Sequence, residues 1–262
     1  MRTPGMNQPV ERFARIHATP AYELVAQAIE REIISGRLRT GEPIGTEAEL
    51  VRQFGVNRST VREGIRLLEQ AGLVHRGASR RRTVCLPHYD QLASRMSRAL
   101  VLHEVTFREL WEASMVLEVA AVEQAALRAT PAVLAELEEN IAKTEAAAHP
   151  SAVAELDTEW HALIAKAAQN RVLQLAREPT MLLNVPTTGA ILENIAAGVP
   201  RLIEAHRAIV ETVRRRDVDA ARLWMRRHLN DWRKGFERLG KDLDQPVDTM
   251  ALPPPASAAG SR

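Results

Sequence analysis

The sequence of 262 residues contains a single cysteine, Cys85, and few aromatic residues. One cysteine cannot form an intramolecular disulfide, and it cannot supply the several thiolates of a cysteine-rich zinc site. The sequence also lacks any apolar run near the ~20 residues of a membrane span, and its first 20 residues lack the apolar core of a signal peptide. We therefore expect a protein of the reducing cytoplasm, with no membrane partner.

Basic charge is unevenly distributed along the chain. Residues 1–90 contain no lysine and hold 14 arginines against 10 acidic residues, whereas the rest of the chain is slightly acidic. The planar guanidinium group binds phosphates and guanine edges in a forked geometry that lysine cannot match. This pattern suggests contact with nucleic acid, but charge alone is equally compatible with an ordinary solvated surface.

Residues 20–87 show the pattern of a winged helix-turn-helix. In the segment TEAELVRQFG, Thr46 and Glu49 have the spacing of a capping box, and Gly55 supplies a helix stop. The segment NRSTVREGIRLLEQAG then begins a second helix, with Asn57 as its N-cap. Two short helices separated by Gly-Val-Asn predict a helix-turn-helix.

A basic hairpin is expected after these two helices. Two β-rich pieces, residues 73–76 and 83–86, flank a loop that carries Gly77, Arg80, Arg81 and Arg82. This is the composition of a wing.

The second helix of a helix-turn-helix lies in the major groove, and its first turn reaches base edges. The predicted DNA contacts are therefore in that turn, in the helix before it and in the wing: Arg58, Ser59, Thr60, Arg62, Thr46, Arg52, Gly77, Arg80, Arg81 and Arg82. Taken alone, Arg58 and Arg62 could equally serve to solubilise an exposed helix. The capped helix before them and the basic wing favour DNA binding.

The remainder of the chain shows helical patterns only, so we expect a mainly α fold in which an all-α helical bundle follows the winged helix-turn-helix. The domains are predicted as a flexible N-terminal arm (1–19), the DNA-binding domain (20–87), an all-α helical domain (88–240) and a disordered tail rich in Pro and Ala (241–262). Helix breakers are expected at Thr130–Pro131, His149–Pro150, Asn170, Pro179, Pro186–Gly189, Gly198–Pro200 and Asp217, which predicts roughly six to eight helices.

Three histidines and one aspartate of the helical part form a candidate metal site. Asp157 and His161 are four residues apart on one helix, and His206 and His228 each lie beside large apolar residues on later helices. For one such histidine, a hydrogen-bonded place in the core is the more common explanation. Four such groups buried together would need several polar partners, which one divalent ion supplies at once. Histidine with carboxylate suits Zn²⁺, Ni²⁺, Mn²⁺ or Fe²⁺.

Two segments resemble known modules. The segments EREIISGRLRTGEPI and TEAELVRQFGVNRSTVREGIRLLEQAGLV, with a terminal TV, resemble the winged helix of GntR-type bacterial transcription regulators. The pattern DTEWH, Asn170, HRAIV and HL resembles the FCD ligand-binding domain of the FadR subfamily. By this resemblance Arg58, Thr60 and Arg62 contact an operator.

The resemblance also implies the rest of the function. Some members of this family bind a metal, and their ligands map onto Asp157, His161, His206 and His228. The resemblance further implies a homodimeric transcription regulator, more often a repressor in this family, that binds an inverted repeat. It would sense a small molecule, such as an organic acid, that binds beside the metal.

The effector contacts implied are Ser114, Glu118 and Asn170. Many members carry an arginine where this chain has Ser114. The sequence leaves open two alternatives, a metalloenzyme with a DNA-binding head and a regulator whose metal is purely structural.

Overall fold

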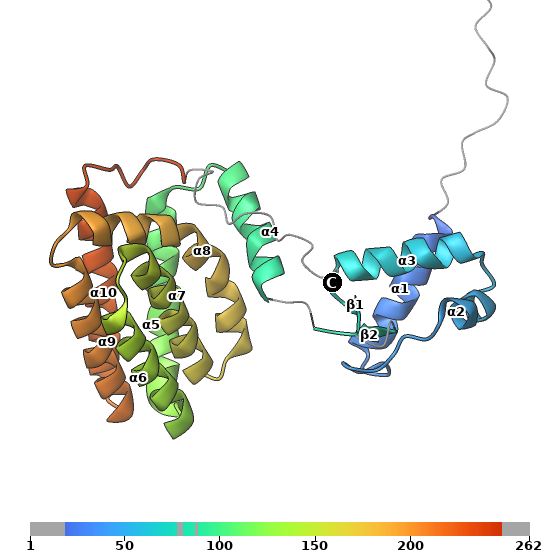
Figure 1. Ribbon diagram of the computed structural model, residues 1–262, viewed down its shortest axis with the longest axis horizontal. Helices are drawn as coiled ribbons and strands as arrows, with labels where there is room; N and C mark the ends of the chain where they lie inside the picture. The colour runs from blue at the N-terminus through green and yellow to red at the C-terminus, as the bar shows by residue number, and fades with distance from the viewer. Residues whose placement is uncertain (1–18, 78–80, 87–88, 248–262) are drawn as a thin grey trace, which may run out of the picture. The chain divides into compact units, whose positions relative to one another are not determined.

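The computed structural model describes residues 19–77, 81–86 and 89–247, and the chain divides into two compact units, one ending at His88 and the other beginning at Tyr89 (Figure 1). The predicted N-terminal arm therefore lies outside the described residues, except for residue 19. Within the part of the chain that the structure describes, no helix has both the length and the apolar character needed to cross a bilayer.

The first unit is a three-helix domain with a small hairpin. Its elements are α1 (Ala21–Ile34), α2 (Glu47–Phe54), α3 (Arg58–Gln70), β1 (Val74–Arg76) and β2 (Arg82–Val84). The two strands are antiparallel, with Val74 opposite Val84. The capping box of Thr46 and Glu49 starts α2, the left-handed Gly55 ends it, and the Asn57 side chain caps α3. These local signals explain why the two helices begin and end where the sequence predicts.

The core of this unit holds α3 tightly against α1. Val61, Ile65 and Leu68 of α3 are buried together with Val25 of α1. Gly64 allows the close approach, because a Cβ atom there would lie 2.8 Å from the carbonyl oxygen of Tyr22. The packing fixes the opposite, polar face of α3 toward solvent.

The second unit is a bundle of helices. They are α4 (Tyr89–Leu102), α5 (Phe107–Arg128), α6 (Pro131–Ala146), α7 (Pro150–Ala167), α8 (Arg171–Asn194), α9 (Gly198–Arg214) and α10 (Val218–Arg238). Helix α5 runs through the middle of the bundle and packs against α7, α8, α9 and α10 (Figure 1). The mainly α fold predicted from the sequence is confirmed.

The prediction that Pro179 and Pro186–Gly189 break the chain into separate helices is wrong. Helix α8 continues through both prolines for 24 residues. A proline inside a helix costs about 3 kcal/mol, whereas burying one large apolar side chain contributes roughly 1.5–3 kcal/mol. Met181, Leu183 and Ile191 of this helix are all buried, so tertiary packing offsets the two prolines.

The prediction of a disordered tail from residue 241 also needs correction. Leu243 and Val247 are buried against the start of α5. The backbone N–H of Val247 donates to the carbonyl of Val105, and Arg108 forms an ion pair with Asp244. Two apolar residues in an otherwise polar segment are enough to hold it on the bundle. The described chain ends at residue 247.

Candidate metal centre and DNA-reading surface

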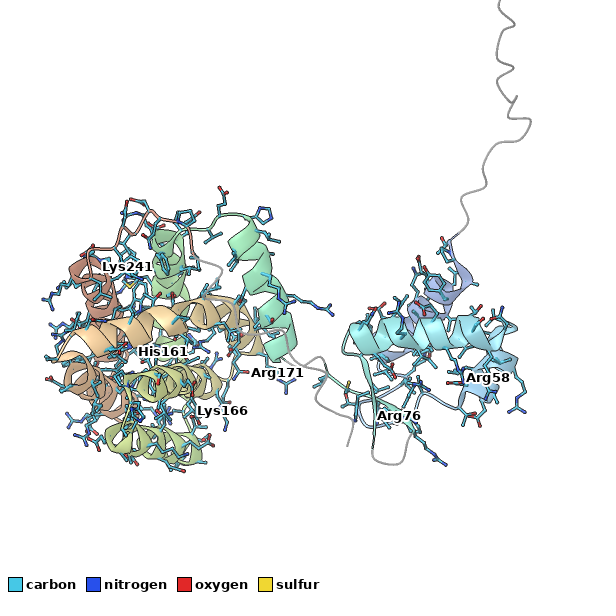
Figure 2. The ribbon with its side chains drawn as sticks, turned by 45° about the horizontal axis from the view of Figure 1, so that its top comes forward. Arg58, Arg76, His161, Lys166, Arg171 and Lys241 are labelled. Carbon is cyan, nitrogen blue, oxygen red and sulfur yellow. The ribbon has the colours of Figure 1, made fainter. Side chains whose placement is uncertain are left out.

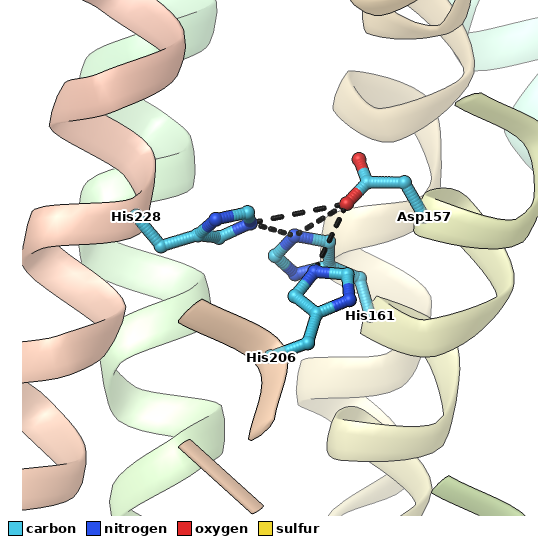
Figure 3. A group of neighbouring side chains, drawn as sticks. All are labelled: Asp157, His161, His206 and His228. Atoms are coloured by element: carbon cyan, nitrogen blue, oxygen red, sulfur yellow. Dashed lines mark hydrogen bonds and ion pairs between the residues drawn. The ribbon is translucent and has the colours of Figure 1, made fainter. Parts of the chain in front are cut away.

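Four side chains from three helices meet inside the bundle. Asp157 and His161 project from α7, His206 from α9 and His228 from α10, and one ligand atom from each lies within 4.8 Å of the others (Figure 3). The structure thus brings together all four residues that the sequence singled out. Asp157, His161 and His206 are buried, and His228 is nearly so.

The spacing of these atoms suits a shared cation. Asp157 Oδ1 lies 3.1 Å from His206 Nε2 and 3.9 Å from the Nε2 atoms of both His161 and His228. The Nε2 atoms of His161 and His228 are themselves 3.1 Å apart. Ligand bonds of about 2.1 Å at tetrahedral or octahedral angles place neighbouring ligand atoms roughly 3.0–3.4 Å apart. The two distances of 3.1 Å fall in that range, and the two of 3.9 Å are longer by about 0.5 Å.

Unsatisfied polar atoms give a second test of the fit. Asp157 Oδ1 and both ring nitrogens of His206 are buried without a hydrogen-bond partner of good geometry among the described residues. His206 is held in place by stacking on Trp160, with the ring centroids 3.7 Å apart and the planes nearly parallel. Buried polar groups without partners are costly, and coordination would satisfy them. The residues present therefore fit a divalent ion.

The electrostatics keep the donors in their binding forms. Burial alone would raise the pKa of Asp157, but the imidazoles of His206, His161 and His228 hold it well below its ordinary value. Burial lowers the pKa of His206, and burial with the neighbouring imidazoles lowers the pKa of His228 to about 3. A carboxylate and neutral imidazoles are the forms that bind metals.

A buried ionic chain lies behind His161. Its Nδ1 is 2.9 Å from Glu118 Oε2, and Glu118 Oε1 accepts a hydrogen bond of 2.7 Å from Arg177 Nε. Burial would raise the pKa of Glu118, but Arg177 and then His161 lower it to about 2. An ionised Glu118 requires the proton of His161 to sit on Nδ1, so that the Nε2 lone pair faces Asp157 and His228.

A cavity adjoins the cluster. Asp157, His161 and His228 form part of its wall, and its volume of about 60 Å³ suits a compact molecule. Its other lining residues are polar side chains (Ser114, Asn184, Thr188, Arg201, Asp231), apolar side chains (Trp111, Met181, Ile191, Leu192, Leu202, Leu229, Trp232) and Gly198. Among these, Ser114 Oγ, Asn184 Oδ1 and Trp111 Nε1 are buried without a partner among the described residues.

The three residues expected to contact an effector lie in different places. Ser114 lines the cavity beside the cluster. Glu118 touches His161 and Arg177 instead, one layer behind the cluster. Asn170 caps α8, where its side-chain oxygen accepts from the backbone N–H groups of Val172 and Leu173. It is not among the described residues that line the cavity, so its place in the motif reflects helix capping.

The polar face of α3 presents arginines at its N-terminal end. Figure 2 labels Arg58 there, at the end of α3 nearest α2. Arg58 and Arg62 are exposed and both donate to Glu47 Oε2, at 3.2 and 2.9 Å. Arg82 of β2 bonds the other oxygen of the same carboxylate. One carboxylate on α2 thus holds three guanidinium groups of the expected DNA-binding surface together.

The remaining expected DNA contacts lie around this group. Ser59 is exposed, and its hydroxyl donates to Asn57. Thr60 is half-buried, while Arg52 and Thr46 are exposed on and before α2. Gly77 and Arg81 lie at the hairpin tip, where the Gly77 N–H donates to the Arg81 carbonyl. Arg80 lies outside the described residues.

Sequence reasoning missed two organising residues. Glu47 follows the capping threonine, and a carboxylate in the first helical turn is usually explained by the helix dipole, so nothing singled it out. Arg177 lies on the buried side of α8, only 1% exposed, in a segment that the sequence divided at Pro179. Arg177 lies on the same helical face as Met181 and Asn184, and this spacing was the sequence signal that could have identified it as buried.

Two family profiles match the chain, one in each of the two units. The sequence profile of the gntR family of bacterial regulatory proteins matches residues 21–84, which run from α1 through β2. The profile of the FCD domain matches residues 109–231, which include Asp157, His161, His206 and His228. The chain belongs to the GntR family.

Curated relatives of this GntR-family chain are named as regulators. It is 30% identical over 160 residues to the Glc operon transcriptional activator of Escherichia coli strain K12, covering 59% of this chain and 63% of that protein. It is 27% identical over 224 residues to the transcriptional repressor NanR of Cronobacter sakazakii, covering 79% and 82%. The solved structure of a GntR protein of Streptococcus agalactiae shares its fold, with a TM-score of 0.56 at 22% identity over 81% of this chain and 99% of that one.

Proposed function

We propose that this GntR-family chain represses or activates transcription from an operator, under the control of a small anionic effector that binds beside a metal ion in the FCD domain. The observation that carries the proposal is the four-ligand cluster beside a cavity within the second unit, whose wall includes three of the four ligands. The exposed arginines of α3 in the first unit supply the DNA-reading surface. Repression is the form we expect, and the cytoplasm, where bacterial chromosomes lie, is the expected location.

The metal would be held by Asp157, His161, His206 and His228. Zn²⁺, Ni²⁺, Mn²⁺ and Fe²⁺ all accept this donor set, and the last three favour six ligands. A six-coordinate ion would have two positions left for the oxygen atoms of a ligand. The bound metal would supply a Lewis-acidic anchor for such oxygens.

The charge of the buried groups indicates how many negative charges the effector carries. Among the fully buried groups, Asp157 and Glu118 contribute two negative charges and Arg177 contributes one positive charge; Glu178, which also pairs with Arg177, is partly exposed to solvent and is left out of the count. With neutral imidazoles the cluster carries a net −1, which a divalent ion converts to +1. One carboxylate on the effector would then neutralise the site, and burying a net charge is costly.

The lining of the cavity suggests the rest of the effector. The basic side chain in the described lining is Arg201, and it already forms an ion pair with Asp231 at 3.0 Å. Away from the cluster, the unpaired polar atoms of the described lining are the hydroxyl of Ser114, the indole N–H of Trp111 and the amide oxygen of Asn184, among apolar side chains. We therefore favour a compact monocarboxylic acid with a hydroxyl or amino group over a dicarboxylic acid.

A thermal-shift experiment tests this proposal. The metal-loaded protein is melted with lactate, 2-hydroxybutyrate, succinate and malate, and the same series is repeated after chelation. We expect the monocarboxylates to raise the Tm of the metal-loaded protein but not of the chelated protein, because a ligand stabilises the native state only when it binds to it. Replacing Ser114 by Arg should move the preference toward the dicarboxylates. If every acid shifted the Tm by the same amount with and without metal, the proposal would be refuted.

DNA binding is tested separately. We expect the homodimer to protect an inverted repeat whose half-sites lie one helical turn apart, because one helix-turn-helix reads only one half-site. Arg58→Ala should abolish specific protection in a footprinting experiment. An unchanged footprint for that variant would refute the role of α3.

A further inference from the structure

The cavity beside the metal cluster shares part of its wall with an open depression on the surface of the bundle. This depression, which we call the outer groove, has a volume of about 520 Å³, and its described lining lies on α9 and α10. Arg201, His228 and Asp231 border both spaces. His228 projects from α10 toward Asp157 (Figure 3), and its side chain, 10% exposed, is the most exposed of the four donors. The outer groove therefore reaches the cluster from the solvent side.

An ion pair separates the two spaces. Arg201 Nε of α9 donates to Asp231 Oδ2 of α10 at 3.0 Å, and the two side chains are 34% and 42% exposed. Ion pairs with this much exposure contribute little stability, and exposed side chains change rotamer within nanoseconds. The pair can therefore open while the helices stay packed. Because both residues border both spaces, opening the pair joins the outer groove to the cavity.

The outer groove is basic, although the chain beyond residue 90 is slightly acidic. Its described lining holds four basic side chains and two acidic ones: Arg201, Arg227, Arg233, Lys234, Glu204 and Asp231. A cleft lined mainly by one sign of charge focuses the electric field and raises the association rate of ions of the opposite sign. The outer groove therefore attracts anions.

Two of these cations are available to an anion from solution. Arg227 and Lys234 are exposed, and neither forms an ion pair within the described part of the chain. They are seven residues apart, roughly 10 Å along the axis, on the same face of α10 as Asp231. Arg227 Cζ lies 5.4 Å from the centroid of the Trp224 ring, which also lines the groove and holds the guanidinium group there. An anion can thus be bound at this face without breaking an existing ion pair.

We propose that the outer groove is the port through which small carboxylates enter the cavity. Arg227 and Lys234 collect the anion from solution, and the Arg201–Asp231 pair opens to admit it. As the pair opens, the carboxylate replaces Asp231 on Arg201, so the guanidinium group keeps an anionic partner. The inference rests on the proposed function only for the nature of the ligand, because any small anion that reaches the cavity reports on the route.

Alkylation of a thiol inside the cavity tests this route on the full-length chain. Cys85 is replaced by Ser, and Ser114→Cys then places a single thiol in the cavity, where Ser114 Oγ is buried without a partner among the described residues. Iodoacetate and iodoacetamide add groups of nearly the same size to the thiol, but only iodoacetate is an anion. The rate with each reagent is divided by its rate with an exposed thiol, introduced as Ala135→Cys in the same Cys85→Ser background. Both are measured with metal and after chelation.

Charge reversal tests the attraction of anions. Arg227→Glu/Lys234→Glu should lower the iodoacetate rate at least about tenfold at low salt and leave the iodoacetamide rate unchanged. The loss should shrink as salt is added, because salt screens exposed charges. The matched control, Arg171→Glu/Arg226→Glu, makes the same change in net charge at two exposed residues outside the described lining of both spaces. It should lower the iodoacetate rate far less.

Substitution of the ion pair tests the gate. Arg201→Ala should raise the rates of both reagents severalfold, because the barrier between the outer groove and the cavity is removed. The charge-swapped variant Arg201→Asp/Asp231→Arg restores the pair and should bring both rates back toward their starting values. Thermal unfolding of each variant checks that faster labelling does not come from a loosened fold.

Three results would overturn the inference. If the groove reversal lowered the iodoacetate rate no more than its control, anions would enter elsewhere. Unchanged rates in Arg201→Ala would show that the pair is not the gate. A thiol that reacted only after unfolding in urea, in every variant, would show a cavity without a port. The proposed function is judged separately, by whether carboxylates shift the Tm through the metal.

Discussion

Replacing Glu118 by Gln should weaken metal binding without touching a metal ligand. The carboxylate of Glu118 accepts from Arg177 and holds the proton of His161 on Nδ1. With Gln, the carbonyl oxygen can still accept from Arg177, but the amide group then faces His161 and donates to Nδ1. The proton moves to Nε2, the atom that faces the cluster, and coordination there is blocked. Partners of this kind are worth about 10–100-fold in metal affinity.

The same substitution removes one of the two carboxylates that pair with the buried Arg177. Breaking a buried ion pair costs roughly 3–5 kcal/mol. We expect the lower end of that range, because one hydrogen bond remains and Arg177 Nη1 also bonds Glu178. The double variant Glu118→Gln with Arg177→Met removes the buried charge as well. It should therefore recover much of the stability but none of the metal affinity.

Two measurements separate these effects. Competition with a chromogenic chelator gives the metal dissociation constant, and urea unfolding in EDTA gives the stability of the metal-free protein. A Glu118→Gln variant that binds metal as tightly as wild type would refute the role assigned to Glu118. A double variant that regains metal affinity together with stability would show that the single substitution acts only by loosening the fold.

Three further predictions concern the metal, the pH and the DNA. Metal at 100 times its dissociation constant should stabilise the wild type by about 2.7 kcal/mol and raise its Tm, and the His206→Ala variant should lose this gain. An undiminished gain in differential scanning fluorimetry would exclude His206 as a ligand. The pKa of Glu118 is lowered from 4.5 to about 2, so its contribution to the free energy of unfolding is complete above pH 4.5 and is lost as the pH falls toward 2. In urea titrations the metal-free wild type should therefore lose up to about 3 kcal/mol of stability over that interval. An equal loss in the Glu118→Gln/Arg177→Met variant would contradict this. Arg81→Ala at the wing should weaken operator binding and lower the slope of log affinity against log salt by about 1, while an unchanged slope in anisotropy titrations would place Arg81 off the phosphates.

Residues that act through local or periodic rules were predictable from the sequence. Thr46, Asn57 and Gly55 mark the helix ends by rules that concern a few neighbouring residues. Asp157 and His161 were recognisable because one helical turn fixes their spacing. His206 and His228 could be joined to them only as a hypothesis, since the distance between two helices depends on the packing of the whole bundle.

Other features depended on tertiary energies that local patterns do not contain. The continuation of α8 through Pro179 follows from buried side chains on either side of it, and the order of residues 241–247 follows from the burial of Leu243 and Val247 in an apolar cluster with α5. The roles of Glu47 and Arg177 required knowing which groups face them. Asn170 shows the converse, because its place in a motif next to the metal ligands reflected helix capping.

Glu47 has a consequence for the thermodynamics of DNA recognition. In the free protein its carboxylate already neutralises part of the charge of Arg58, Arg62 and Arg82, so these side chains need fewer salt ions around them. When DNA binds, phosphates compete with an internal counterion rather than displacing anions from solution. Fewer ions are then released than the number of arginines suggests, and the affinity for non-specific DNA at low salt is lower than it would be without Glu47. The carboxylate would thus improve discrimination by lowering the background rather than by strengthening the operator complex.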